Sequence, residues 1–251
     1  CTLILSLIGV VLYGRSQTVT PATVKSASLL LVILRCCFIC VIASTLLASY
    51  FKLSSVDLCN DDGTKCLKFS GKLQFSTFTR WCWILQGFYF AFANLQQCSP
   101  GLLPARWMQM LFGTAVSSAV MVTTVTYLVL VPGVLLLPQP AHRQGSITIL
   151  LSWQGHTMHC LCSVFMLVEI MLGEEVMQLA DLPAGAFWLL LYGLFEWAFH
   201  ASTGLWHYPF LDHSKPFSWL IHALLVAAFA LYWVAGCKMT AKLRAREKRL
   251  L

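Results

Sequence analysis

Long apolar runs separated by short polar connectors dominate the chain. Runs of about 20 residues, the length that an α-helix needs to cross the hydrocarbon core of a bilayer, occupy 29–51, 75–94, 107–131, 147–171, 184–203 and 217–237. Residues 1–13 are apolar but too short to span, and we interpret them as a truncated first helix. The pattern predicts an all-α, polytopic transmembrane helix bundle with about six complete spans plus the truncated N-terminal one.

The polar segments divide the chain into three parts. We expect a truncated helix and polar connector at 1–28, one transmembrane bundle at 29–237, and a basic tail at 238–251. Basic residues beside a membrane span favour the cytosolic side, so the tail predicts a cytosolic C-terminus. With six spans, the loops at 52–74, 132–146 and 205–216 then face the lumen or the exterior.

Composition agrees with a membrane protein and argues against a nucleic-acid partner. The chain is 58% hydrophobic and 11% charged, whereas soluble domains carry about 25% charged residues. The formal net charge is +7, but six of the 17 Lys and Arg residues lie in the last fourteen positions. The positive charge is therefore that of a tail next to a membrane surface and not that of a groove.

Two of the eleven cysteines differ from the others. Most lie in apolar runs, where they behave as small hydrophobic residues, but Cys59 and Cys66 flank the polar segment 60–65. Two thiols without a further Cys or His nearby make only half a metal site. We predict a disulfide between them, which requires an oxidising compartment and agrees with a lumenal loop at 52–74.

Candidate chemistry gathers at the lumenal side of the predicted bundle. The stretch Trp153-Gln-Gly-His-Thr-Met-His159 puts two histidines three residues apart, which predicts that His156 and His159 share one helix face. Ionisable groups in a span are costly unless paired or facing a cavity, so they indicate function. Thr77 and Thr79 begin the second span. A hydroxyl beside an imidazole can act as nucleophile and base toward an acyl carbon.

Less specific interpretations compete with this one. Ser and Thr in membrane helices often bond to the carbonyl four residues earlier, and Glu196 and His200 are spaced to neutralise each other on one helix. Glu169, ten residues after His159, falls on a different helix face and is not expected to orient that histidine. A metal site is a further alternative, although the chain has no His-Glu-x-x-His motif; its nitrogens would come from His156, His159, His200, His207 and His213.

Three segments of the chain hold polar and aromatic residues in distinctive patterns. The first runs from Phe75 to Phe90, with Thr79 followed seven residues later by Gln; the second is Trp153 to His159, with Glu169 beyond it. The third and most specific is His200-Ala-Ser-Thr-Gly-Leu-Trp-His-Tyr-Pro-Phe-Leu-Asp-His213. These segments resemble the androgen-induced and androgen-dependent TFPI-regulating family of membrane threonine hydrolases, and the resemblance covers roughly 29–237.

The resemblance implies a hydrolase of fatty acid esters of hydroxy fatty acids that needs no cofactor. By position, Thr79 is the nucleophile and His159 the general base, with His156 and His200 as supporting hydrogen-bond partners. Thr77 is the nucleophile if the alignment shifts by two residues. The expected setting is the endoplasmic reticulum or plasma membrane, with a lipid ester as substrate. The alternative is a non-catalytic membrane protein that binds lipid or scaffolds partners and uses these polar groups to join helices.

Overall fold

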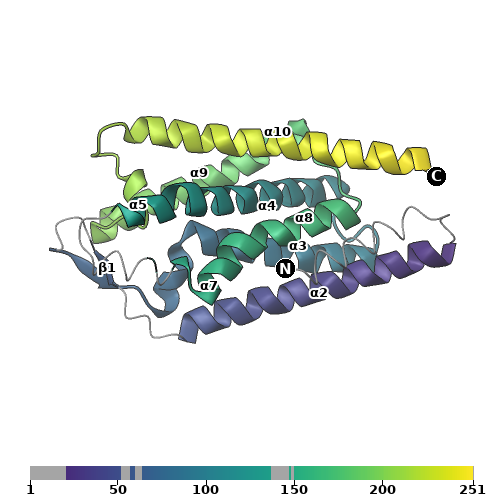
Figure 1. Ribbon diagram of the computed structural model, residues 1–251, viewed down its shortest axis with the longest axis horizontal. Coiled ribbons are helices and arrows are strands. Elements are labelled where there is room, and N and C mark those ends of the chain that lie inside the picture. The colour runs from purple at the N-terminus through teal and green to yellow at the C-terminus, as the bar shows by residue number, and fades with distance from the viewer. Residues whose placement is uncertain (1–20, 52–56, 60–63, 137–146, 148–149, 251) are drawn as a thin grey trace.

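The computed structural model describes residues 21–51, 57–59, 64–136, 147 and 150–250. The predicted truncated helix at 1–13 lies outside these residues. The described helices run along one long axis, and a two-stranded hairpin lies at one end of the bundle (Figure 1). The elements are α2 (Pro21–Phe51), β1 (Asp57–Cys59), β2 (Cys66–Lys68), η1 (Gly71–Ser76), α3 (Phe78–Cys98), α4 (Ala105–Val125), η2 (Thr126–Leu130), α5 (Val131–Leu135), α7 (Trp153–His156), η3 (Thr157–Leu161), α8 (Cys162–Leu172), η4 (Leu179–Asp181), α9 (Leu182–Thr203), η5 (Pro209–Leu211) and α10 (Ser218–Leu250).

Five helical stretches of the described chain are long and apolar enough to cross a membrane. They are Leu29–Phe51, Ala105–Leu135, Trp153–Leu172, Leu179–Thr203 and Ser218–Arg249. The chain is therefore an all-α, multi-pass membrane protein by length and composition. Helix α3 is not among the five, and its polar residues include Arg80, Gln86 and Asn94. The predicted count of six spans stays a prediction.

Several helices are longer than the hydropathy pattern indicated. Helix α2 begins at Pro21, so the last part of the connector predicted at 14–28 is helical. The third span continues through η2 and α5 to Leu135, which corrects the loop predicted from Pro132. Pro132 lies just after the π-helical segment η2, where the regular hydrogen-bond pattern of this continuous helix is already interrupted. Helix α10 likewise carries the basic tail to Leu250.

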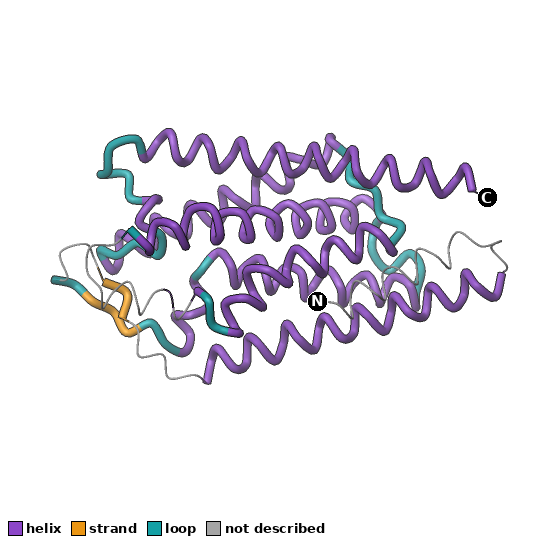
Figure 2. The backbone as a smooth tube through the Cα atoms, viewed as in Figure 1, coloured by secondary structure: helices purple, strands orange, loops and turns teal. Residues whose placement is uncertain are grey.

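Helix α4 is at the centre of the bundle and packs against α3, α8, α9 and α10 (Figure 2). Its buried face is rich in small residues, which let neighbouring helices approach closely in a membrane. At Gly113 a Cβ atom would lie 2.6 Å from the indole of Trp233, which is fully buried. The same ring would meet a Cβ at Gly185. Glycine at both positions therefore allows α4, α9 and α10 to close around one tryptophan.

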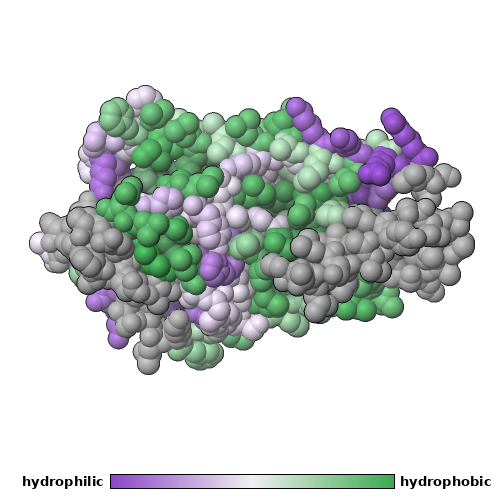
Figure 3. Space-filling view, viewed as in Figure 1, coloured by the Kyte–Doolittle hydropathy of each residue, from purple (hydrophilic) through white to green (hydrophobic). Residues whose placement is uncertain are grey.

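Strands β1 and β2 pair antiparallel, with Cys59 opposite Cys66. The two cysteines form the predicted disulfide, with 4.1 Å between their Cα atoms. The hairpin lies at the end of the bundle opposite the C-terminus (Figure 1). Between the two ends, apolar side chains cover much of the face in Figure 3, and hydrophilic residues gather at the C-terminal end of α10.

A buried ion pair joins α2 to α8. Arg35 donates from Nε and Nη2 to the two carboxylate oxygens of Glu169, at 3.0 and 2.5 Å. The hydroxyl of Tyr89 donates to the same carboxylate at 2.8 Å, and Arg35 also reaches Gln97 at 3.1 Å. Burial of a charge requires such partners, because an unpaired ion in an apolar interior is strongly destabilising. Glu169 is thus a structural partner of Arg35.

Candidate functional site

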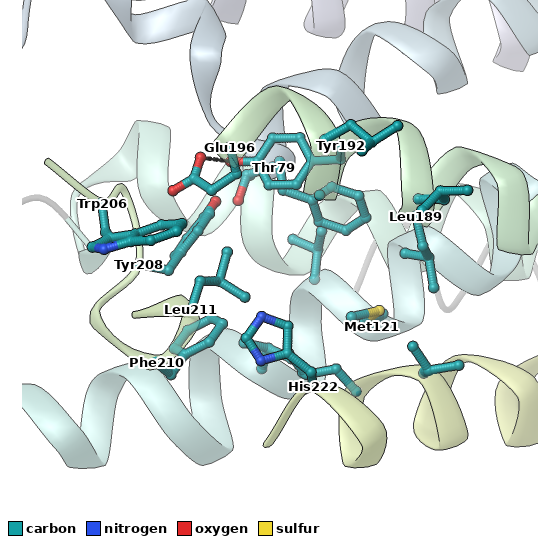
Figure 4. Close-up of a pocket in the computed structure, with 18 of the residues that line it drawn as sticks. Thr79, Met121, Leu189, Tyr192, Glu196, Trp206, Tyr208, Phe210, Leu211 and His222 are labelled. Atoms are coloured by element: carbon teal, nitrogen blue, oxygen red, sulfur yellow. Dashed lines mark hydrogen bonds between the residues drawn. The ribbon is translucent and has the colours of Figure 1, made fainter. Parts of the chain in front are cut away.

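An apolar cavity of about 330 Å³ lies between α3, α4, α9 and α10, near the hairpin end of the bundle. The chain after α9 closes one side of it (Figure 4). Most of the lining side chains are aliphatic or aromatic. The lining side chains best suited to acyl chemistry are those of Thr79, Glu196, Tyr208 and His222. A cavity with this lining suits a ligand that is mostly hydrocarbon with a small polar group.

Thr79 lies in the first turn of α3 and lines the cavity. Thr77, the alternative nucleophile, is the N-cap residue of that helix and is not among the cavity-lining residues. The Thr77 hydroxyl is 3.4 Å from the carbonyl oxygen of Gln74 and accepts from Arg80 at 3.4 Å. Of the two threonines, only Thr79 therefore has access to the cavity.

His159 lies in η3, which packs against α3. It is 8% exposed, and its Nδ1 atom has no hydrogen-bond partner of good geometry among the described residues. It lies within electrostatic range of Arg80, the residue after Thr79. However, His159 does not line the cavity, and no hydrogen bond between described residues joins it to Thr79. The structure brings the predicted nucleophile and base to neighbouring elements, not into contact.

The helix around the two histidines is not regular. Residues 157–161 form a π-helical turn. Such turns are rare in proteins, but where they occur they often lie at functional sites. His156 is exposed and bonds through Nδ1 to the hydroxyl of Tyr127 at 2.7 Å, whereas His159 is buried. The two side chains therefore differ in exposure, and the shared helix face stays a prediction. The hydroxyl of Thr123 donates to the His159 carbonyl oxygen at 2.6 Å.

His200, the other predicted supporting residue, lies near the end of α9 and stacks on Trp206, with ring centroids 4.1 Å apart. Trp206 lines the cavity but His200 does not. Glu196, which the spacing paired with His200, instead contacts His207. The reversal of the chain at Gly204, which has a φ of +75°, brings His207 back against α9. Sequence spacing along one helix could not reveal this partner.

Four buried groups form a hydrogen-bonded chain behind the cavity wall. Glu196 accepts from the main-chain N–H of His207 at 2.7 Å and contacts its Nδ1 at 2.8 Å. The Nε2 atom of His207 is 2.5 Å from Oγ of Ser76. Tyr192 donates to both Glu196 and the Ser76 carbonyl, each at 3.2 Å. This series of hydrogen bonds joins η1, α9 and the 204–213 segment.

The order hydroxyl, imidazole, carboxylate in this chain is that of a nucleophilic triad. Ser76 and His207 nevertheless do not line the cavity. The rings of Phe199, Phe195 and Phe69 lie around His207, with centroids 4.0, 6.4 and 6.1 Å from that of the imidazole. Because neither residue lines the cavity, we describe these hydrogen bonds as a clamp on the residues that do face the cavity.

His222 and Tyr208 face the cavity but were not predicted as site residues. The Nδ1 atom of His222 bonds to the Ser218 carbonyl at 2.7 Å, so in the neutral ring the other nitrogen is free to accept a proton. The sequence held one signal for it, since His222 is an ionisable residue shortly after the start of the last predicted span. Tyr208 stood within the third motif, but nothing in the sequence directs its hydroxyl toward Thr79.

Two of the five histidines of the metal alternative bond to side chains other than histidine in the described structure. His156 bonds to Tyr127 and His207 to Glu196, while His200 and His213 have ring centroids 6.1 Å apart. Among the described residues, no three His, Cys, Asp or Glu side chains form a group that could hold a metal ion.

The fold and the cavity define a multi-pass helical membrane protein with an apolar cavity near one end of its bundle. Comparison of the chain with family models, with curated proteins and with solved structures gives no match. The function is therefore argued from the residues of the site.

Proposed function

We propose that the protein is a membrane-embedded hydrolase of lipid carboxylic esters, with Thr79 as its nucleophile. The observation that carries this proposal is the position of the Thr79 hydroxyl in the wall of an apolar cavity, beside Tyr208 and Glu196. The apolar side chains can hold an acyl chain, and the threonine is then close to the ester group. Fatty acid esters of hydroxy fatty acids, the substrates implied by the resemblance, combine such a chain with an internal ester.

In the proposed reaction, the Thr79 oxygen attacks the ester carbonyl carbon while an imidazole takes its proton. The tetrahedral intermediate collapses, and the alcohol leaves with that proton. Water then attacks the acyl-threonine by the same route and releases the fatty acid. We assign the base to His159, since its Nδ1 atom is buried without a good partner and its helix packs against α3. To act, it must come within hydrogen-bonding distance of Thr79 when substrate is bound.

The proposed orientation has the basic C-terminal tail in the cytosol and the cavity toward the lumen or exterior, in the endoplasmic reticulum or plasma membrane. Two observations support it. The basic residues at the end of α10 fit the positive-inside rule. The Cys59–Cys66 disulfide lies at the opposite end of the bundle, and disulfides persist in oxidising compartments.

Covalent labelling with a fluorophosphonate probe, followed by peptide mapping, tests the nucleophile. We expect the adduct on Thr79 and its loss in Thr79→Ala, together with a fall in lipid-ester turnover to background. Thr124→Ala is the matched control, because the Thr124 hydroxyl only bonds back to the Val120 carbonyl at 2.8 Å. An adduct on Thr77 or Ser76 would move the nucleophile to that residue.

A non-catalytic lipid-binding protein is the second candidate, and the predominantly apolar lining of the cavity favours it. This candidate predicts that folded protein takes no fluorophosphonate label and hydrolyses no lipid ester. A photoreactive fatty acid would nevertheless crosslink to cavity residues such as Leu189. That combination of results would replace the hydrolase proposal.

A further inference from the structure

The Tyr208 hydroxyl and the start of α3 meet at the cavity wall. Figure 4 shows the phenol directed toward Thr79 and Glu196, with His222 across the cavity. The side chain and the main-chain N–H of Thr79 both lie close enough to the Tyr208 phenol to lower its pKa. Tyr208 is therefore next to the proposed nucleophile on the side where an ester carbonyl would lie.

The backbone of Thr79 adds a second donor at this position. The amides of Arg80 and Trp81 both donate to the Thr77 carbonyl at 3.1 Å, so the helical hydrogen bonds of α3 begin with them. The Thr79 amide precedes them and has no acceptor within the helix. Amides at a helix N-terminus also carry the positive end of the helix dipole, which favours negative charge beside them.

The clamp described above fixes Tyr208 in place. Its neighbour His207 is held at the main chain and at the ring by Glu196, which is 1% exposed. Ser76 holds the other ring nitrogen and lies three residues before Thr79. One set of buried hydrogen bonds thus sets the distance between the segment that carries Tyr208 and the helix start that carries Thr79.

The surroundings keep the Tyr208 hydroxyl protonated. Burial raises the pKa of this phenol to about 12, and the nearby Glu196 carboxylate acts in the same direction, although hydrogen bonds from Thr79 lower it. The phenol can therefore donate a hydrogen bond at neutral pH. A neutral donor that is fixed before the reaction is the kind of group that stabilises a developing oxyanion.

We propose that the Tyr208 O–H and the Thr79 N–H form the oxyanion hole of this site, which makes Tyr208 a catalytic residue. The inference rests on the proposed function. As the Thr79 oxygen bonds to the carbonyl carbon, the π electrons of the C=O bond move to its oxygen. The Thr79 N–H turns from the Tyr208 phenol oxygen to this oxygen, and the Tyr208 O–H donates to it as well. When the C=O bond re-forms, the alcohol leaves and takes the proton held by the imidazole. Tyr208 keeps its proton throughout.

Steady-state hydrolysis by Tyr208→Phe tests the proposal. Loss of one oxyanion donor lowers kcat by about 10²–10³-fold, and we expect KM to change less than about threefold, because the ring still lines the cavity. Tyr50→Phe is the control: it removes the same hydroxyl from a tyrosine at the end of α2, 41% exposed, and should leave kcat unchanged. A kcat for Tyr208→Phe near wild type, or a change confined to KM, would overturn the inference.

A second measurement separates proton donation from packing. Fluorotyrosine at position 208 keeps the hydroxyl but lowers the phenol pKa, so activity should be lost at a lower pH than in the wild type. A purely structural role for the hydroxyl predicts the same alkaline limit in both proteins. If folded wild-type protein hydrolyses no ester and labels nowhere, the proposed function fails and this inference with it. If Thr79 is labelled but kcat is unaffected by Tyr208→Phe, the oxyanion assignment alone fails.

Discussion

Glu196 and His207 are bonded twice, through the main-chain N–H at 2.7 Å and through Nδ1 at 2.8 Å. Both side chains are about 1% exposed. Eleven residues separate them, and the left-handed conformation of Gly204 makes the contact possible. One carboxylate thereby fixes the chain segment that closes the cavity.

Replacement of Glu196 by Gln should therefore weaken both the fold and the site. The amide cannot accept from two His207 donors and Tyr192 as the carboxylate does. We expect the unfolding free energy to fall by about 2–3 kcal/mol, the usual loss when buried donors lose a charged acceptor. Thermal unfolding in detergent measures this. Glu247→Gln is the control: it alters an ion pair with Arg244 on the partly exposed tail and should change the unfolding free energy by less than about 0.5 kcal/mol. Equal losses of unfolding free energy in the Glu196 and Glu247 variants would contradict the role of Glu196 in the clamp.

Three histidine-to-glutamine variants test which imidazole is the base. We expect His159→Gln to lower ester turnover by about 10²–10⁴-fold, the typical contribution of a general base. His156→Gln should retain much of the rate, because His156 is exposed and bonds to Tyr127. His222→Gln should also remain active. The opposite order for His159 and His222 would transfer the base to the imidazole that lines the cavity.

The Arg35–Glu169 pair should tolerate joint replacement better than single truncation. Arg35→Ala leaves the Glu169 carboxylate buried with only neutral donors such as Tyr89, and we expect a loss of about 3–5 kcal/mol. The double variant Arg35→Met with Glu169→Leu removes both charges and should recover most of that stability. Thermal unfolding of the three proteins measures the effect. A double variant as unstable as the single one would show that the charges themselves are required for the fold.

The Cys59–Cys66 disulfide should stabilise the hairpin by up to about 2–3 kcal/mol, the chain-entropy value for so short a loop. In intact vesicles, maleimide should modify the two cysteines only after reduction. Cys98 is a useful control, because it is free, exposed and near the opposite end of the bundle. A membrane-impermeant maleimide should reach Cys98 and the reduced pair from opposite sides. Modification from the same side would contradict the proposed topology.

The sequence by itself determined the class of the fold and the disulfide. Long apolar runs have few alternatives to helices in a bilayer, because every backbone polar group must be satisfied within the segment. Five of these runs are found as long apolar helices. Cys59 and Cys66 could be paired because they are close in sequence within a polar loop.

Contacts between distant segments were decided only by the tertiary structure. Regular helix spacing treated His156 and His159 alike, but in the structure the first is exposed and the second, in the π-helical turn at 157–161, is buried. The same kind of spacing paired Glu196 with His200, whereas the chain reversal at Gly204 gives it His207. Periodicity describes one helix at a time, and the cavity is built by several helices together. The neighbours of Thr79, including Tyr208 on another segment, therefore became visible only when the helices were packed.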